Sequence, residues 1–205
     1  MTVNGAQASL GTPVGPADRV CLDGRAVGGE EEHVYLALNK PIGIDCSTDR
    51  RVPDNILDFV DHRLRIFPVG RLDKDSQGLI LLTNDGDIVN ELLRVEHGHE
   101  KEYRVTVDKP VTDEFLAALA RGVRILGTRT RPARTERIDA HAFRIVLTQG
   151  LNRQIRRMCA VFGYRVLRLE RTRIVNITLT GLALGRWRDL TGSELAGLLP
   201  ERFGR

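Results

Sequence analysis

An apolar run between two polar turns, at residues 79–83, most constrains the fold of this chain. It reads Leu-Ile-Leu-Leu-Thr and is followed at once by Asn-Asp-Gly over residues 84–86. Such a run, closed by turn residues, predicts a buried β-strand. Three acids surround it, because Asp73 and Asp75 precede the run and Asp85 follows it. Asp75 and Asp85 fit turn or capping positions, which leaves Asp73 as the acid whose role has to be explained.

The segments on either side of this run predict the fold class. Residues 34–38, 103–107 and 142–150 have the apolar or alternating pattern of strands. Helical spacing over residues 54–64 and 112–122 predicts two helices, with Asp54 and Thr112 as their N-caps. Strands and helices alternate irregularly, and hairpin turns are frequent. The chain is therefore predicted to be an α+β protein, with helices flanking a mainly antiparallel, mixed sheet.

Length predicts one medium domain or a domain with a fragment, since the chain has 205 residues. Residues 1–27 suggest a small β piece that cannot bury much surface alone. Residues 28–33 are rich in glycine and acids, as expected of a linker. The main domain is predicted over residues 34–205.

Several classes of protein are excluded by what the sequence lacks. It has no apolar run near the ~20 residues of a membrane span, and its first residues do not form a signal peptide. Its 3 cysteines are odd in number and far apart, which indicates neither a disulfide framework nor a zinc site. His97 and His99 fit a solvated loop better than a metal site. A cytoplasmic protein without metal is expected.

Arginines concentrate in the second half of the chain, although the net charge is only +4. They cluster over residues 121–137 and 144–173, and arginine favours forked contacts to phosphate. This is the electrostatic pattern of a nucleic-acid binder, although arginines at ordinary surface positions would give the same composition. Arg131 and Arg134, in the basic segment Arg-Thr-Arg-Pro-Ala-Arg-Thr, are predicted to contact phosphate, with a solvated loop as the alternative.

Three polar motifs interrupt sequence that otherwise looks like protein core. They are Gly-Arg-Leu-Asp at 70–73, Lys-Glu-Tyr at 101–103 and Leu-Asn-Arg-Gln-Ile-Arg-Arg at 151–157. Together with LNKPIG and FGYRVLRLERTRI, they resemble the RsuA-like family of pseudouridine synthases over residues 34–199. The segments GRLDKDSQGLI, HEKEYRVTVDKPVTDEF and LERTRIVN are most similar to its RluF branch. Residues 1–27 resemble the closing strands of an S4 RNA-binding domain that lacks its helical half.

The resemblance implies the pseudouridine synthase fold and an isomerase that acts on structured RNA. The expected substrate is a uridine of 23S ribosomal RNA, with a tRNA anticodon stem-loop as a second candidate. No cofactor is implied, because the isomerisation needs neither a redox partner nor a metal. A monomer without membrane contact is expected. The competing hypothesis is a non-catalytic RNA-binding or ribosome-assembly module on the same fold.

The same resemblance gives roles to residues in the three motifs. Asp73 is expected to be the nucleophile, acting at C6 of the uracil or at C1′ of the ribose. Burial of a carboxylate favours its neutral form, so a cation must lie beside it; Arg156 matches the family's position for that cation. Tyr103 is expected to stack on a flipped-out uracil, and Ile155 to pack against it. Asp73, Tyr103 and Arg156 must then line one cleft.

Weaker candidates for RNA contact surround these residues. Arg71 is expected to enter the stack opened by the flipped nucleotide or to hold phosphate. Gln154 and Arg153 are candidates for orienting the site, and Arg157 and Lys40 for substrate contact. The candidates in all these motifs have structural alternatives. Asp73 would then be a buried acid paired with Arg71, and Tyr103 a residue of the sheet core. The basic cluster would be an exposed helix face, and Lys40 a solvent-facing side chain.

Overall fold

The computed structural model describes residues 1–15, 17–27, 32–93 and 98–204. The chain divides into two compact units, Met1–His33 and Val34–Arg205. Most of the predicted linker, residues 28–31, lies outside the described residues.

The first unit is a small antiparallel sheet in the order β2-β1-β3-β4. Its strands are Thr2–Val3, Ala6–Gln7, Val20–Leu22 and Arg25–Val27 for β1 to β4. Two tight hairpins close it at Asn4-Gly5 and Asp23-Gly24, and all four of these residues have positive φ. Asn-Gly and Asp-Gly favour this backbone in two-residue hairpins. The S4-like identity of this unit stays a prediction.

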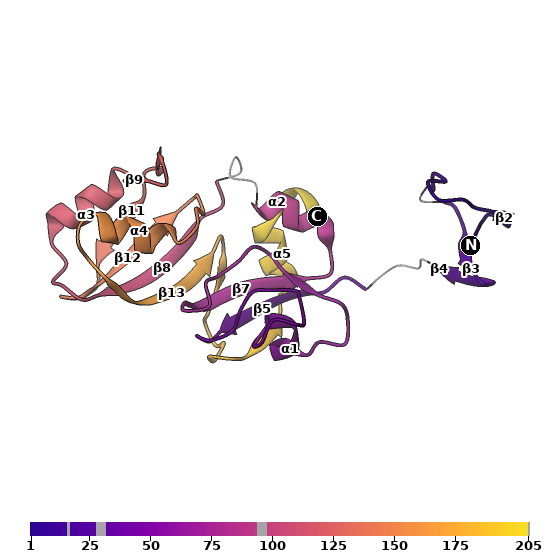
Figure 1. Ribbon diagram of the computed structural model, residues 1–205, viewed down its shortest axis with the longest axis horizontal. Coiled ribbons are helices and arrows are strands. Elements are labelled where there is room, and N and C mark those ends of the chain that lie inside the picture. Colours follow the sequence, from indigo (N-terminus) through magenta and orange to yellow (C-terminus); the bar gives the residue numbers. More distant parts are fainter. Residues whose placement is uncertain (16, 28–31, 94–97, 205) are drawn as a thin grey trace. The chain divides into compact units, whose positions relative to one another are not determined.

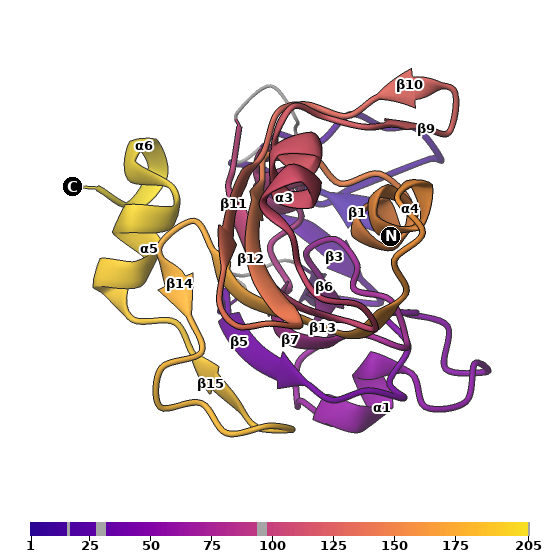
Figure 2. The same ribbon diagram turned by 90° about the vertical axis from the view of Figure 1, so that its left-hand side faces the viewer.

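The second unit is built on one long sheet with strand order β11-β12-β8-β13-β7-β5-β15. Figure 1 labels β11 to β5 of this order, and Figure 2 labels β15. β14 adds to β13 and β6 adds to β7. Neighbours pair antiparallel except β13 and β7, which are parallel. The predicted α+β class is confirmed. The strands are β5 Tyr35–Lys40, β6 Phe67–Pro68, β7 Gln77–Thr83, β8 Lys101–Val107, β11 Arg134–Arg137, β12 Ala142–Leu147, β13 Val166–Ile174, β14 Ile177–Thr178 and β15 Trp187–Asp189.

Helices cover different parts of this sheet (Figures 1 and 2). α3 and α4 pack on β8 and β12, while α2 and α5 pack on one face of β7 and β5 and α1 on the other. A small hairpin of β9 and β10 lies beside the first pair. The bounds are α1 Ile56–Val60, α2 Gly86–Leu93, α3 Asp113–Ala120, α4 Gln154–Val161, α5 Gly192–Leu198, α6 Pro200–Phe203, β9 Arg124–Ile125 and β10 Thr128–Arg129.

Caps explain where two of these helices begin. Thr112 caps α3 by accepting a hydrogen bond from the Phe115 amide, as predicted. The prediction of Asp54 as the cap of α1 is wrong, because Asn55 accepts from the Asp58 amide. Asp54 has φ of 57° and belongs to the preceding turn. A neighbouring asparagine meets the requirement for a side-chain acceptor equally well.

β7 is buried along its whole length, which explains its unbroken apolar run. Leu79 and Leu81 face the cluster under α2 and α5, whereas Ile80 and Leu82 face the cluster under α1. Successive side chains of a strand point to opposite faces. A strand covered on both faces therefore needs apolar residues without alternation.

The contact between β7 and β13 depends on Gly78. Its φ is +107°, and a Cβ built there would lie 2.3 Å from the Arg171 carbonyl oxygen. Glycine alone adopts this backbone freely and lets another backbone approach so closely. The two halves of the sheet join at this point.

Candidate active site

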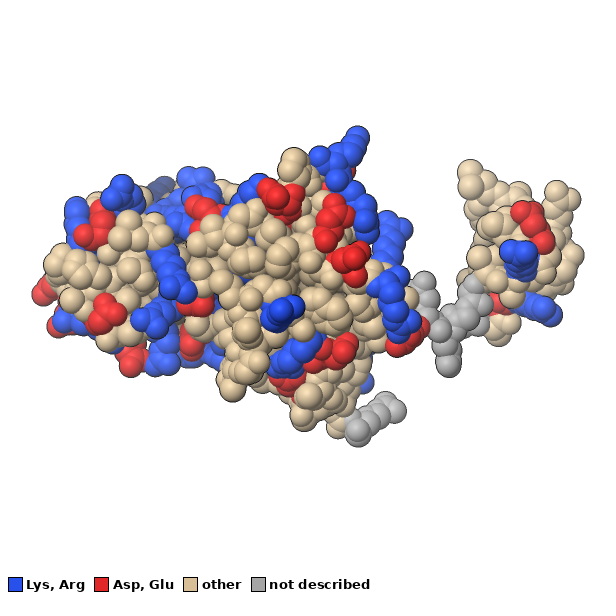
Figure 3. Space-filling view, turned by 90° about the horizontal axis from the view of Figure 1, so that it is seen from below, with Lys and Arg blue, Asp and Glu red and all other residues tan. Residues whose placement is uncertain are grey.

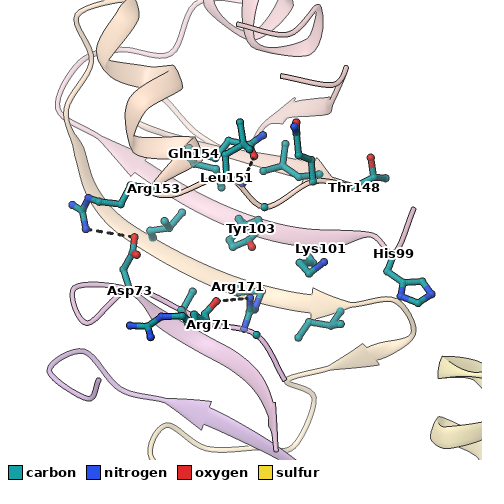
Figure 4. Close-up of a pocket in the computed structure, with 18 of the residues that line it drawn as sticks. Arg71, Asp73, His99, Lys101, Tyr103, Thr148, Leu151, Arg153, Gln154 and Arg171 are labelled. Atoms are coloured by element: carbon teal, nitrogen blue, oxygen red, sulfur yellow. Dashed lines mark hydrogen bonds and ion pairs between the residues drawn. The ribbon is translucent and has the colours of Figure 1, made fainter. Parts of the chain in front are cut away.

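A cavity of about 530 Å³ lies on the sheet where the two halves join. It is lined by residues 69–73, side chains of β8 and β13, and the segment 147–155 that leads into α4. In Figure 4, Asp73 lies toward one end, Lys101 toward the other, and Tyr103 and Arg171 between them. The volume falls in the range of about 300–1,000 Å³ typical of small-ligand pockets.

The backbone around Asp73 is tied to the core on both sides. The Leu72 amide donates to the Cys46 thiol sulfur at 3.3 Å, and that thiol donates to the Leu72 carbonyl at 3.1 Å. On the other side, the Gly43 amide donates to the Lys74 carbonyl at 2.8 Å. These bonds hold the Asp73 carboxylate at a fixed place on the cavity wall, as a nucleophile requires.

Lys40 holds the segment 41–44, whose Gly43 amide bonds the loop after Asp73. Its side chain is fully buried, and its ammonium donates to the carbonyls of Pro41 and Ile44 at 2.9 and 2.7 Å. Burial lowers the pKa of the Lys40 ammonium. The expectation that Lys40 faces solvent is therefore wrong, because its side chain has no exposed surface, whereas its contact with substrate stays a prediction.

The predicted ion pair between Asp73 and Arg156 is also wrong. The cation beside Asp73 is Arg153, whose Nη1 lies 3.5 Å from the carboxylate. Arg153 also pairs with Asp75 through contacts of 3.1 and 2.9 Å, and this pairing is the main cause of the lowered pKa of Asp75. Asp73 therefore shares its arginine with a second carboxylate.

Arg156 instead fixes the turn that follows Asp73. Its Nη2 donates to the Asp75 carbonyl at 2.9 Å and to the Ser76 hydroxyl at 3.1 Å, and its Nη1 donates to the Val166 carbonyl. It also lies 3.4 Å from the Asp75 carboxylate. It is not among the described residues that line the cavity. The geometry gives Arg156 a supporting position.

Two further predicted residues do line the cavity with Asp73. Tyr103, on β8, exposes part of its ring there, and Ile155 is buried at the start of α4. Gln154 holds that segment through a hydrogen bond from the Leu151 amide at 2.9 Å. An apolar side chain and an aromatic ring in one cavity suit a planar base.

The other basic candidates lie at the rim or outside. Arg71 is 73% exposed and lies 3.7 Å from Asp45, so it is not the partner of Asp73. Arg157 is exposed and donates to the Asn152 carbonyl and side chain. Arg134 pairs with Glu100 at 2.7 Å on the sheet, and Arg131 is exposed. Neither Arg131 nor Arg134 is among the described residues that line the cavity.

Sequence reasoning missed two cations of the cavity, Arg171 and Lys101. Arg171 is 3% exposed, and burial lowers the pKa of Lys101, with the Arg171 charge as a second cause. Lys101 stands two residues before Tyr103, and this spacing in a strand would have signalled a shared face. Arg171 gave no signal, because it is one of four arginines over residues 165–173.

Charge elsewhere is mixed. Figure 3 shows one face of the molecule on which basic side chains lie among acidic ones and do not form a single basic field. The described residues contain no cluster of three or more histidines, cysteines or acids that would hold a metal. Among them there is also no helix with the length and apolar character that crossing a bilayer requires.

Comparison with known proteins gives one consistent family. Residues 34–161 match the family model described as RNA pseudouridylate synthase. The chain is 54% identical over 198 residues to the dual-specificity RNA pseudouridine synthase RluF of Escherichia coli K12, covering 96% of this chain and 68% of that protein. It is 36% identical over 189 residues to ribosomal small subunit pseudouridine synthase A of the same strain, covering 90% and 82%. A crystal structure of a pseudouridylate synthase superimposes with a TM-score of 0.78 at 33% identity, covering 97% of this chain and 88% of that one.

Proposed function

Because the chain belongs to the RNA pseudouridylate synthase family, we propose that it converts a specific uridine of structured RNA to pseudouridine with Asp73 as its nucleophile. One observation carries the proposal: a single cavity holds the Asp73 carboxylate, the Tyr103 ring and the Ile155 side chain. A non-catalytic RNA-binding module would not need a carboxylate anchored on the wall of a base-sized cavity.

The chemistry moves one glycosidic bond from N1 to C5 of the same base. In one route the Asp73 carboxylate attacks C1′, the N1–C1′ bond breaks, and its electron pair leaves with the uracil. The base then turns, C5 bonds to C1′, and the carboxylate is released; the C5 proton is lost and N1 gains one. In the other route the carboxylate adds to C6 as the electron pair of the C5–C6 double bond moves to O4; the same exchange of N1–C1′ for C5–C1′ follows, and the carboxylate leaves C6 when C5 loses its proton and the double bond re-forms. Both routes suit a carboxylate nucleophile.

The cavity side chains replace the stacking contacts that the flipped base loses when it leaves the RNA. Tyr103 offers a ring for stacking, and Ile155 offers an apolar surface against the other side of the base. Arg153 lies 3.5 Å from the Asp73 carboxylate and supplies the positive charge beside it. Arg71 is exposed at the rim, where it contacts phosphate or fills the space left by the nucleotide.

The substrate we propose is a uridine of 23S ribosomal RNA, with a tRNA anticodon stem-loop as a second substrate. The name of the Escherichia coli K12 relative includes a dual specificity for RNA, which is the basis for naming two. Arg131, Arg134 and Arg157 are proposed to contact phosphate, and residues 1–27 to be the remnant of an S4-like RNA-binding module. The protein is proposed to act as a cytoplasmic monomer.

The test is incubation of the full chain with unmodified transcripts of 23S ribosomal RNA and of tRNA, followed by mapping of pseudouridine. A new pseudouridine in either transcript, absent with Asp73→Asn, is the expected result. Salt-sensitive RNA binding without any base change would favour the binding module instead.

A further inference from the structure

Arg171 is a buried cation whose hydrogen-bonding capacity is only partly used. Its Nε donates to the Leu79 carbonyl at 2.6 Å, and its Nη1 reaches the Arg71 carbonyl at 3.4 Å. Its Nη2 is buried and has no partner among the described residues. An unpaired N–H of a charged group in a closed site is costly. This arrangement is explained if an acceptor arrives with the substrate.

The register of β13 directs Arg171 into the cavity, and a bulge after Arg171 places Arg173 on the other face. The register pairs Arg171 with Tyr103 but Arg173 with Glu102, and it shifts between these two positions. Arg171 and Arg173 would share a face in a regular strand; the bulge turns them to opposite faces. Arg171 therefore lies beside the cavity tyrosine, while Arg173 pairs with Glu100 and Glu102.

A second cation lines the same part of the cavity. Lys101 is on the same face of β8 as Tyr103, and no hydrogen bond or ion pair engages its ammonium among the described residues. The carboxylate of the site, Asp73, is paired with Arg153 at the rim. The cavity thus has its nucleophile at one end and two cations without carboxylate partners farther along (Figure 4).

We propose that Arg171, assisted by Lys101, is the oxyanion site of the reaction: its guanidinium donates to a uracil carbonyl oxygen as negative charge develops there. The inference rests on the proposed function and adds to it a side chain that stabilises negative charge during the reaction. In the C1′ route the electron pair of the broken N1–C1′ bond spreads to the carbonyl oxygens. In the C6 route the electron pair of the C5–C6 double bond moves to O4. Each oxygen is neutralised when the new C–C bond forms, so the site serves either route.

The surroundings of Arg171 favour a base carbonyl over a phosphate. Leu81, Leu147, Leu169 and Ile174 line the same cavity, and apolar walls suit a planar ring with a few polar edges. Among the described residues, the Nη end is held only by the long contact to the Arg71 carbonyl, so a small side-chain rotation presents Nη2 to the ring. Arg156 also has an unpartnered Nε, but it does not line the cavity.

The test compares Arg171→Met with Arg173→Met, a matched control two residues away on the opposite face. Single-turnover rates are measured at saturating concentrations of whichever unmodified transcript the wild type modifies, and RNA affinity is measured as a function of salt. Arg171→Met is expected to lower the rate by about 100- to 1,000-fold, the loss typical of a missing oxyanion donor, with unchanged RNA affinity and salt dependence. Arg173→Met is expected to retain the wild-type rate within threefold.

A second variant keeps the inference falsifiable if Arg171→Met fails to fold. Lys101→Met removes a cation that makes no hydrogen bond to the part of the chain that the structure describes, and it is expected to lower the rate about tenfold at unchanged affinity. A folded Arg171→Met protein with a wild-type rate, or an unchanged rate in Lys101→Met when Arg171→Met is unfolded, would overturn the inference and leave the proposed function intact. A wild-type protein that forms no pseudouridine would instead remove the proposed function itself.

Discussion

The two faces of β8, β12 and β13 both carry basic side chains, but among the described residues a cluster on the outer face is paired with carboxylates and those on the cavity face are not. On the outer face, every arginine of one cluster meets a carboxylate; this outer network consists of Arg134, Arg144, Arg173, Glu100, Glu102 and Glu136. On the cavity face, Arg171 and Lys101 have no carboxylate partner among the described residues. One strand, β13, contributes an arginine to each.

The contrast separates charged side chains that stabilise the fold from charged side chains that serve the reaction. Partly exposed ion pairs contribute little each, typically about 0–1 kcal/mol. A buried cation with an open donor lowers stability, and proteins keep such groups where function requires them. The following variants test that division, from the largest expected effect to the smallest.

Replacing the nucleophile on the cavity face should have the largest effect. Asp73→Asn is expected to lower the rate of pseudouridine formation by at least about 10,000-fold, as for other catalytic nucleophiles, while thermal stability and RNA affinity stay near wild type. Asp113→Asn is the control, because Asp113 is an exposed acid paired with Arg137. Retained activity in Asp73→Asn would exclude Asp73 as the nucleophile.

Gly78→Ala should push apart β7 and β13, the two strands whose contact joins the halves of the sheet. The new Cβ would meet the Arg171 carbonyl oxygen at 2.3 Å on a backbone with φ of +107°, so we expect a loss of about 3 kcal/mol or more in unfolding free energy. Gly86→Ala is the matched control, since nothing lies within 4 Å of its added Cβ. Equal stabilities of the two variants in urea denaturation would contradict this explanation of the junction.

Asp75→Asn tests whether the Asp75 carboxylate, which is paired with Arg153, helps to position Asp73. It removes the main partner of Arg153 and one contact of Arg156, so the turn after Asp73 should loosen. We expect a rate lower by about tenfold at unchanged affinity, because misplacement of a reacting group by 1 Å costs up to about 100-fold. A rate equal to that of wild type would assign Asp75 to stability alone.

Glu194 tests a paired acid remote from the cavity. Arg188 binds its carboxylate through two contacts of 2.7 Å and lowers its pKa from 4.5 to about 2. The stability it contributes is therefore present above pH 4.5 and is lost as the pH falls from 4.5 toward 2. Glu194→Gln should flatten that part of the Tm-versus-pH curve without changing the rate at neutral pH; an unchanged acid limb would refute the linkage.

Arg134→Met, in the outer network, should have the smallest effect. Arg134 is 69% exposed, so about 0–1 kcal/mol of stability is expected to be lost, with the catalytic rate unchanged. Because Arg134 is also proposed to contact phosphate, the slope of log affinity against log salt should fall by about 1. An unchanged slope would show that Arg134 does not contact phosphate and belongs to the outer network alone.

The sequence alone determined a strand over residues 79–83, which in the structure begins at Gln77, and the motifs that meet in the cavity. An apolar run closed by Asn-Asp-Gly leaves few structures other than a strand buried on both faces. The resemblance then placed Asp73, Tyr103 and Ile155 together, and the cavity does contain all three. Thr112 was also identified as a cap, since capping depends on neighbours within a few residues.

Only the tertiary structure decided which arginines reach the cavity. Arg153 has φ of 49°, outside the helical path of α4, so its side chain reaches Asp73 while Arg156 binds the next turn. The bulge after Arg171 in β13 likewise places Arg173 on the outer face, while Arg171 stays on the cavity face. The physical reason is the same in both cases. A single backbone irregularity reverses the direction of a long side chain, and residue type and spacing do not encode where that irregularity falls.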